Sequence, residues 1–228
     1  MKFFIPIKEQ SQRVPKKNFR SFANLPLYKH TLYKLKDFEV YVDTDSEEII
    51  KEVKKDKNLS HVTAYKRSPR LVDHNISVCK LIKHFIVHEQ QSIENDIICQ
   101  IHVTSPFLSV ATLVAAAKKF DEGHDSVTSC TPVQKRFWRK EEYGMCPVNH
   151  NPMILQQTQD LPVYYEENSL FYMFYSDIVL NSGNRIGKNP HFYPTSFLES
   201  LDIDTENDWD FVNTIQNSAK TKKYRRFL

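Results

Sequence analysis

Over the first 131 residues, short apolar segments alternate with longer amphipathic ones. The apolar segments are typical of buried strands, whereas apolar residues spaced by about 3.6 positions predict helices. This alternation favours an α/β fold, in which a mostly parallel sheet has helices on both faces. The predicted strands are residues 3–7, 39–43, 62–65, 96–103 and 126–131, and the predicted helices are residues 28–36, 47–55, 77–89 and 110–120.

Residues 135–161 interrupt the alternation, because they are rich in Pro, Asn, Gln and charge without a clear period. An irregular segment of this length inside a compact domain usually has a function or forms a contact with a partner. A chain of 228 residues is long enough to bury a substantial core. We therefore expect a single domain, residues 1–228, with one excursion.

Composition limits the classes of partner. The 31 Lys and Arg residues and 28 Asp and Glu residues leave a net charge of +3, too balanced for a surface that binds nucleic acid. The basic residues 221–228 are expected to be a solvated helix end rather than a contact to RNA or lipid. No apolar leader or membrane span is visible, so we expect a cytoplasmic protein without membrane or nucleic-acid partners. The four cysteines lack C-x-x-C spacing and are expected to be reduced, buried thiols: Cys79, Cys99, Cys130 and Cys146.

A basic loop follows the first predicted strand. Residues 8–17 contain four cations and one acid, and Pro15 restricts the backbone that presents them. A strand that leads into a cationic loop is where an α/β protein often holds a phosphate-bearing ligand. A solvated basic turn is the alternative. The four cations are Lys8, Arg13, Lys16 and Lys17.

Near the other end of the chain, Asp202 and Asp204 are two residues apart. On an extended segment both carboxylates point to the same side. Two anionic oxygen ligands suit Mg²⁺, which completes its shell with water and substrate phosphate. The alternative is that Asp204 or Thr205 caps a following helix, with Glu206 and Asp208 in its first turn. Together with the basic loop, the acidic pair suggests metal-assisted chemistry on a nucleotide.

Seven segments, in order, are similar to those of one enzyme family. They are IPIKEQSQRVPKKN (5–18), NLPL (24–27), VDTDSEEI (42–49), RSPRLVDHNIS (67–77), HVTSPFL (102–108), QDLPVYYEENSLFY (159–172) and SLDIDTENDW (200–209). They resemble the N-acylneuraminate cytidylyltransferases, also called CMP-sialic acid synthetases, and related cytidylyltransferases of keto-deoxy sugar acids. No single segment is specific, but together they cover most of the chain.

The resemblance implies a Rossmann-like sheet of the nucleotide-diphospho-sugar transferase type. It implies that a hydroxyl of a sialic-acid-like, keto-deoxy sugar acid attacks the α-phosphorus of CTP, and that pyrophosphate leaves. Mg²⁺ would be the cofactor. Residues 135–165 would project, form a homodimer contact and help to build the neighbouring subunit's sugar site.

The resemblance also implies roles for individual residues. Lys17, Asp202 and Asp204 would be catalytic, and the two aspartates would hold the metal. A second D-x-D, at Asp43 and Asp45, would be mainly structural, with Asp45 capping the helix that starts at Ser46. The implied nucleotide-binding residues are Lys8, Ser11, Gln12, Lys17, Asn18, Arg67, Ser77 and His102, and the implied sugar-binding residues are Thr104, Gln159, Asn168 and Tyr172.

The chain departs from the family at positions that would contact substrates. Glu9 and Gln10 replace glycines of the phosphate loop, and Gln12 replaces a lysine. His102 replaces a glutamine beside the nucleotide, and Thr158 replaces an arginine associated with the sugar carboxylate. The segment that faces the sugar is also more acidic than in the family, at Glu166 and Glu167.

These departures leave three interpretations open. The first is a synthetase for a keto-deoxy sugar acid, including an amino-substituted acid whose cation suits Glu166 or Glu167. The second is a nucleotidyltransferase of the same fold whose acceptor is a phosphonate or a polyol phosphate. The third is a nucleotide-binding subunit that has lost turnover. Retention of Lys17, Asn18 and the acidic pair favours activity.

Overall fold

The computed structural model describes residues 1–73, 75–89 and 96–218. At its centre is a seven-stranded sheet with the order β11-β7-β10-β6-β1-β4-β5. Only β10 is antiparallel to its neighbours β6 and β7, so the sheet is mostly parallel. The strands are β1 (Lys2–Ile7), β4 (Glu39–Thr44), β5 (Val62–Lys66), β6 (Ile97–Ile101), β7 (Ser126–Val133), β10 (Tyr164–Tyr175) and β11 (Pro190–Pro194).

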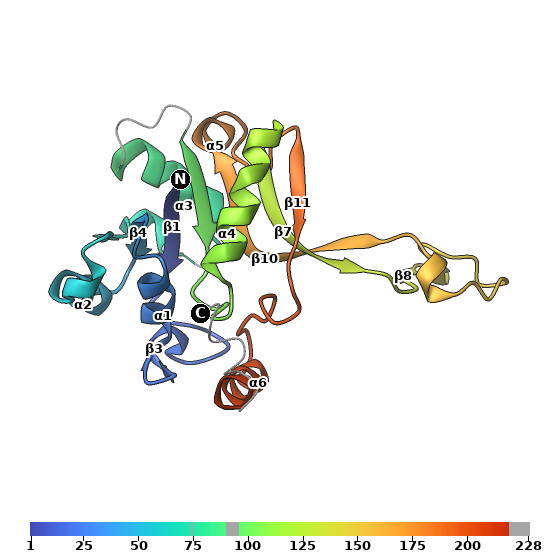
Figure 1. The fold of residues 1–228 in the computed structure, drawn as a ribbon, viewed down its shortest axis with the longest axis horizontal. Coiled ribbons are helices and arrows are strands. Elements are labelled where there is room, and N and C mark those ends of the chain that lie inside the picture. The colour runs from blue at the N-terminus through green and yellow to red at the C-terminus, as the bar shows by residue number, and fades with distance from the viewer. Residues whose placement is uncertain (74, 90–95, 219–228) are drawn as a thin grey trace.

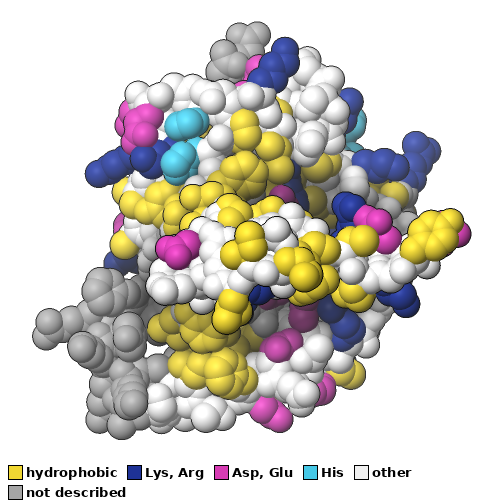
Figure 2. Space-filling view, turned by 90° about the vertical axis from the view of Figure 1, so that its right-hand side faces the viewer, with side chains coloured by type: hydrophobic (Ala, Val, Ile, Leu, Met, Phe, Trp, Pro, Cys, Tyr) yellow, Lys and Arg dark blue, Asp and Glu magenta, His cyan; other side chains and the backbone are white. Residues whose placement is uncertain are grey.

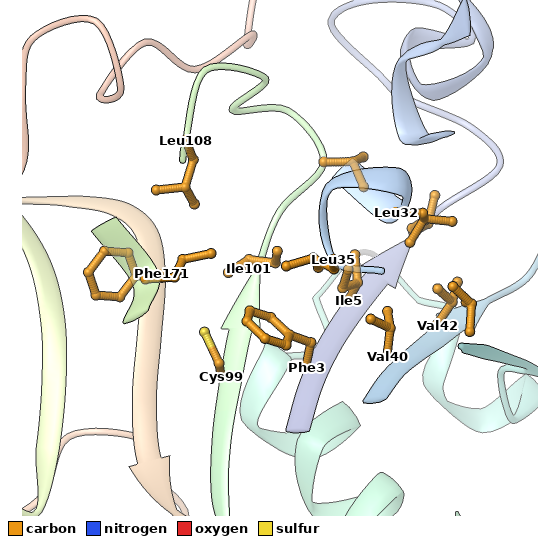
Figure 3. Close-up of a cluster of buried hydrophobic side chains, with 14 of the residues drawn as sticks. Phe3, Ile5, Leu32, Leu35, Val40, Val42, Cys99, Ile101, Leu108 and Phe171 are labelled. Atoms are coloured by element: carbon orange, nitrogen blue, oxygen red, sulfur yellow. The ribbon is translucent and has the colours of Figure 1, made fainter. Parts of the chain in front are cut away.

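Helices cover both faces of the sheet (Figure 1). On one face, α1, α2 and α4 pack on a buried cluster that includes Phe3, Ile5 and Ile101 (Figure 3). On the other face, α3 and α5 pack on a cluster around Phe4 and Phe85. Successive residues of β1 enter opposite clusters, as the period of a strand requires. The helices are α1 (Leu27–Lys34), α2 (Glu47–Lys55), α3 (Val78–His84), α4 (Val110–Ala117), α5 (Ser176–Ser182) and α6 (Glu206–Asn217).

The predicted α/β fold is confirmed. Each predicted strand and helix up to residue 131 is present within a few residues, although β6 ends at Ile101 and the helix from Ser77 changes to a π-helical turn at Phe85–Glu89. The sequence prediction stopped before β10, α5 and β11, and it treated α6 only as a possible helix start. Two short hairpin strands, β2 (Ser21–Phe22) and β3 (Leu25–Pro26), lie between β1 and α1.

Residues between β7 and β10 form an arm that extends away from the sheet (Figure 1). The paired ends of β7 and β10 form its base, and the hairpin β8 (Trp138–Glu141) and β9 (Gly144–Pro147) lies on it. Figure 2 shows the molecule from the side on which the arm extends, and hydrophobic side chains gather on this face. The assignment of one domain and the use of residues 135–165 as a dimer contact stay predictions.

Three further expectations from the sequence can be compared with the structure. The basic residues 221–228 lie outside the described residues. No described helix combines the length and apolar character needed to cross a membrane. All four cysteines are free, but only Cys99 and Cys130 are buried. The expectation of burial was wrong for the half-exposed Cys79 and Cys146, because Cys146 lies on the arm and Cys79 on the partly exposed α3.

Candidate functional site

The basic loop and the acidic pair meet at the carboxyl ends of the strands. Lys17, in a 3-10 helix after the loop, donates from Nζ to the carbonyl of Ile203, and its Nζ lies 3.6 Å from Asp204 Oδ1. Arg13 Nη2 lies 2.7 Å from the same Asp204 oxygen. Residues almost two hundred positions apart thus form one site at the carboxyl ends of the parallel strands, where α/β proteins usually bind their ligands.

The segment after β6 forms the third side of this site. Ser105 donates from Oγ to Asp202 Oδ1 at 3.0 Å, and the backbone N–H of Ile203 donates to the carbonyl of Thr104 at 3.0 Å. Because these bonds hold the acidic segment at Asp202 and at Ile203, they fix it beside the end of β6.

Thr205, and not Asp204, caps α6. Its hydroxyl accepts from the backbone N–H of Asp208, while the Asp208 carboxylate accepts from the backbone N–H of Thr205, which is a complete capping box. The structural alternative for Asp204 is therefore excluded. Its carboxylate remains available to the site.

Two predicted site residues have a buried acceptor without a partner in the described structure. Asn18 donates from Nδ2 to the Lys8 carbonyl at 2.8 Å, and Asn168 donates to the hydroxyls of Thr131 and Thr195 at 3.0 and 2.8 Å. The Oδ1 atoms of both amides are buried and accept no hydrogen bond. Buried polar atoms are rarely left unpaired, so these two oxygens are candidates for ligand contacts.

His102 lies beside the acidic pair. Its Nε2 is 2.9 Å from Gln100 Nε2, and Gln100 Oε1 accepts from Arg185 Nη1 at 2.6 Å. Burial lowers the pKa of His102 below its usual value; Asp202 opposes this, and the nearby cations of Arg185 and Lys17 reinforce it. The imidazole is therefore neutral at physiological pH.

Tyr172 connects this polar cluster to the core. Its ring is buried, and the Arg185 guanidinium lies over it with Cζ 3.3 Å from the ring centroid. Its hydroxyl donates to Glu167 and lies 2.9 Å from Ser169 Oγ. Burial, followed by the bond to Glu167, raises the pKa of Tyr172, so the phenol is neutral.

The remaining predicted residues form no hydrogen bond with this cluster in the described part of the chain. Arg67 is fully buried and donates to Asp43, with Nη1 left unpaired. Ser77 is exposed before α3, and Gln159 lies on the arm. Ser11 and Gln12 lie on the loop after β1, where Gln12 is exposed.

The expected cap at Asp45 was wrong. The N-cap of α2 is Ser46, without a side-chain bond, and Asp45 Oδ1 instead accepts from the backbone N–H of Glu9 at 2.7 Å. The Asp45 carboxylate therefore bonds to the backbone of the basic loop instead of to the backbone N–H groups of α2. This bond links the end of β4 to the basic loop. The second D-x-D is structural, as expected, since Asp43 pairs with Arg67.

Sequence reasoning missed four side chains of the site. Arg13 was noted only as a loop charge, and Ser105 only as part of a matching segment. Gln100 and Arg185 had no signal, because they are 85 positions apart and neither belongs to a short motif.

Comparison with protein families matches residues 3–224 to the cytidylyltransferase model. The chain belongs to the cytidylyltransferase family. The chain is 31% identical over 208 residues to N-acylneuraminate cytidylyltransferase A of Danio rerio, covering 87% of the chain and 46% of that protein. The chain thus spans about half the length of that relative.

Two bacterial relatives have a length closer to that of this cytidylyltransferase. The CMP-N,N'-diacetyllegionaminic acid synthase of Legionella pneumophila is 29% identical, covering 90% of this chain and 91% of its own. The pseudaminic acid cytidylyltransferase of Campylobacter jejuni is 25% identical, covering 92% and 94%.

Solved structures share the fold. A CMP:2-keto-3-deoxy-manno-octonic acid synthetase complexed with CTP has a TM-score of 0.63 at 13% identity, covering 94% of this cytidylyltransferase and 97% of its own chain. A 4-diphosphocytidyl-2C-methyl-D-erythritol synthase has a TM-score of 0.64 at 12% identity, covering 95% and 98%.

The donor set at the acidic pair fits a magnesium ion. Asp202 and Asp204 meet protein donors only through Oδ1 among the described residues, which leaves both Oδ2 atoms unused. No group of three or more His, Cys, Asp or Glu forms a metal cage in the described parts of the chain. Mg²⁺ suits such a site, because it takes one or two carboxylates and completes its shell with water and phosphate oxygens.

Proposed function

We propose that this protein transfers CMP from CTP to a keto-deoxy sugar acid and releases pyrophosphate. The main support is the ion pair between Lys17 and Asp204, which brings the basic loop against the acidic pair at the carboxyl ends of the strands. The relatives named for sialic, legionaminic and pseudaminic acids favour an acceptor of this class.

On the nucleotide side, the cations of the loop and the acidic pair neutralise each other until substrate arrives. Arg13 and Lys17 both face Asp204. When CTP binds, these cations would turn to its phosphate oxygens, and Asp202 and Asp204 would hold Mg²⁺. The metal, when bound, would polarise the phosphoryl oxygens and neutralise the charge that develops on them. Asn18 would accept a hydrogen bond from a donor group of the nucleotide through its unpaired Oδ1.

On the acceptor side, Asn168 offers an unpaired buried oxygen to a sugar hydroxyl. The acceptor would lie beside the end of β6, next to Thr104 and Tyr172. Glu167 is engaged by the Tyr172 hydroxyl. The carboxylate of Glu166, on the exposed outer part of β10, is then the group that suits an amino-substituted acid.

The proposed enzyme acts as a homodimer through its arm. Thr158 and Gln159 lie in the segment between β7 and β10 that forms the arm, and not on the three segments that form the site of their own subunit. In a dimer, an arm that reaches the neighbouring cleft would place Gln159 near the acceptor there. The cytoplasmic location expected from the sequence stays a prediction.

The test is turnover of CTP with a panel of keto-deoxy sugar acids, measured as pyrophosphate release with and without Mg²⁺. Asp204→Asn should lower kcat by roughly 100-fold with a much smaller change in CTP affinity, because the metal acts mainly as charge develops in the transition state. Asp210→Asn removes an exposed carboxylate of α6 and is the matched control.

Three outcomes separate the interpretations. Turnover with a phosphonate or polyol phosphate, and with none of the sugar acids, would replace the acceptor class. CTP binding without turnover on any acceptor would indicate the nucleotide-binding subunit. Full turnover without a divalent metal would exclude the role given to Asp202 and Asp204.

A further inference from the structure

Three polar side chains form a chain of hydrogen bonds behind the acidic pair. Arg185, in the loop after α5, lies over the Tyr172 ring and donates from Nη1 to Gln100 Oε1 at 2.6 Å. Gln100 Nε2 in turn lies 2.9 Å from His102 Nε2. Gln100 is fully buried on β6, and its amide is held between these two partners.

The chemistry of arginine sets the direction of this chain. A guanidinium has five donors and no acceptor, so the Gln100 atom beside Arg185 is the oxygen. The amide nitrogen of Gln100 therefore faces His102 Nε2 and donates to it. Since Nε2 must accept, it holds no proton, and the proton of the neutral ring is on Nδ1.

We infer that Arg185 and Gln100 fix His102 as the Nδ1–H tautomer, which presents one hydrogen-bond donor to an acceptor oxygen of the bound substrate. Arg185 and Gln100 are positioning residues, and His102 is the residue that touches the ligand. The inference rests on the proposed function for the identity of that ligand, whereas the tautomer belongs to the free protein.

The charges that face His102 are consistent with this state. Asp202 and Asp204 approach it from the acidic segment, Lys17 from the basic loop and Arg185 from the loop after α5. The two carboxylates favour an imidazolium, while the two cations and burial disfavour it. A second proton on Nε2 would also point at the NH₂ group of Gln100, which is a contact between two donors.

This polarity explains the departure from the family at position 102. A glutamine there would accept from Gln100 with its oxygen and present its own NH₂ group to the substrate. The Nδ1–H of histidine preserves a donor at that place. The ligand group is therefore an oxygen acceptor of the nucleotide or of the sugar acid, and His102 does not act as a general base through Nε2.

The loop that holds Arg185 is itself anchored. The backbone N–H groups of Lys188 and Asn189 donate to Asp125 Oδ2 at 2.7 and 3.0 Å. A Cβ at Gly187 would lie 2.2 Å from the Asp125 side chain, so only glycine allows this approach. The guanidinium is thus set before substrate binds.

The tautomer is measured by ¹⁵N NMR of histidine-labelled free protein, with the His102 signal assigned by its loss in His102→Gln. We expect a protonated, pyrrole-type Nδ1 and a pyridine-type Nε2. Gln100→Glu preserves the shape of the side chain and the bond to Arg185, but offers only acceptors to His102. It should therefore place a proton on Nε2.

Arg185→Met removes the donor while retaining apolar contact with Tyr172, so the amide can turn and the preference for Nδ1–H should fall. Lys188→Met removes an exposed cation of the same loop and should leave the tautomer unchanged. An Nε2–H signal in the wild type, or no change with Gln100→Glu, would overturn the inference.

Turnover supplies the second readout. Loss of one hydrogen bond to substrate should make His102→Leu about tenfold slower, whereas His102→Gln should lose much less. Equal losses in both variants would contradict the donor role. Because NMR reads the free protein, failure of CTP turnover with every acceptor would refute the proposed function without changing the result for the tautomer.

Discussion

At the scale of single residues, the departures from the family differ in their consequences. The backbone N–H of Glu9 donates a hydrogen bond to the Asp45 carboxylate, and the Glu9 side chain is exposed on the loop. Gln12 is also exposed, beside Arg13, which pairs with Asp204. Since Arg13 and Lys17 already supply two cations at the acidic pair, the loop retains positive charge without a lysine at position 12.

Gln12→Lys should still strengthen phosphate binding. One additional charge-assisted hydrogen bond to a phosphate oxygen should raise CTP affinity or kcat by about tenfold, which equals about 1.4 kcal/mol. Steady-state kinetics over a range of CTP concentrations measure the change. Thr63→Lys adds the same charge on β5 and is the control for a general effect of net charge. A slower Gln12→Lys enzyme would mean that Gln12 is adapted to its own substrate.

At the scale of elements, the strands that could be predicted from the sequence are those with a clear local pattern of apolar residues. The early strands are apolar on both faces because helices cover both, so β1 stands out as a continuous apolar run and β4 as a shorter one, residues 40–42. Strand β10 was missed because Glu166, Glu167 and the positive φ of Ser169 interrupt its pattern. Its pairing with β7 also shifts register between Glu167 and Tyr172.

The residues of the site also divide into those that a short segment reveals and those that only the fold brings together. Lys17 and the acidic pair were predictable, because each lies in a short segment whose charges are close in sequence. The bonds among Arg185, Gln100 and His102 were not, since they depend on how β6 and the loop after α5 meet. Contacts of this kind leave no periodicity or spacing for sequence reasoning to find.

The packing of α1 on the β2–β3 hairpin should make stability depend on pH. His30 of α1 bonds through Nε2 to the carbonyl of Phe22. Burial lowers the pKa of His30, and the Phe22 bond only partly opposes this. The unfolded chain therefore takes up the proton first, so stability is complete above about pH 6.5 and is lost as pH falls below it.

We expect the free energy of unfolding to fall between about pH 7 and pH 5.5, and to fall less in His30→Gln, which retains a donor for Phe22. Urea unfolding at several pH values measures both slopes. Equal slopes in the two proteins would show that other groups cause the dependence.

At the scale of the whole molecule, the arm carries large apolar side chains that stay exposed in the single subunit. Its exposed apolar side chains include Tyr143, Met153 and Leu155, which are 95%, 89% and 94% exposed. Large exposed apolar surfaces usually mark contacts with a partner. A second copy suits this surface, because an isologous dimer would cover both arms at once and bring Gln159 to the neighbouring cleft.

Mixing two inactive variants tests whether arms serve neighbouring clefts. Asp204→Asn disables the cleft of its own subunit, and Gln159→Ala disables the arm. In a mixed dimer, the cleft with Asp204 receives the arm with Gln159, so one of the two sites is complete. Random exchange of equal amounts should restore about one quarter of wild-type turnover, because half of the dimers are mixed and each has one working site.

Leu155→Asp in both variants is the control, since a charge on the exposed tip should prevent the arms from packing. Light scattering should then report monomers, and mixing should restore nothing. Recovery with monomeric arms would show that complementation has another cause. Dimers without recovery would place Gln159 at the site of its own subunit. In that case only a subunit that has both Asp204 and Gln159 is active, and each variant lacks one of the two.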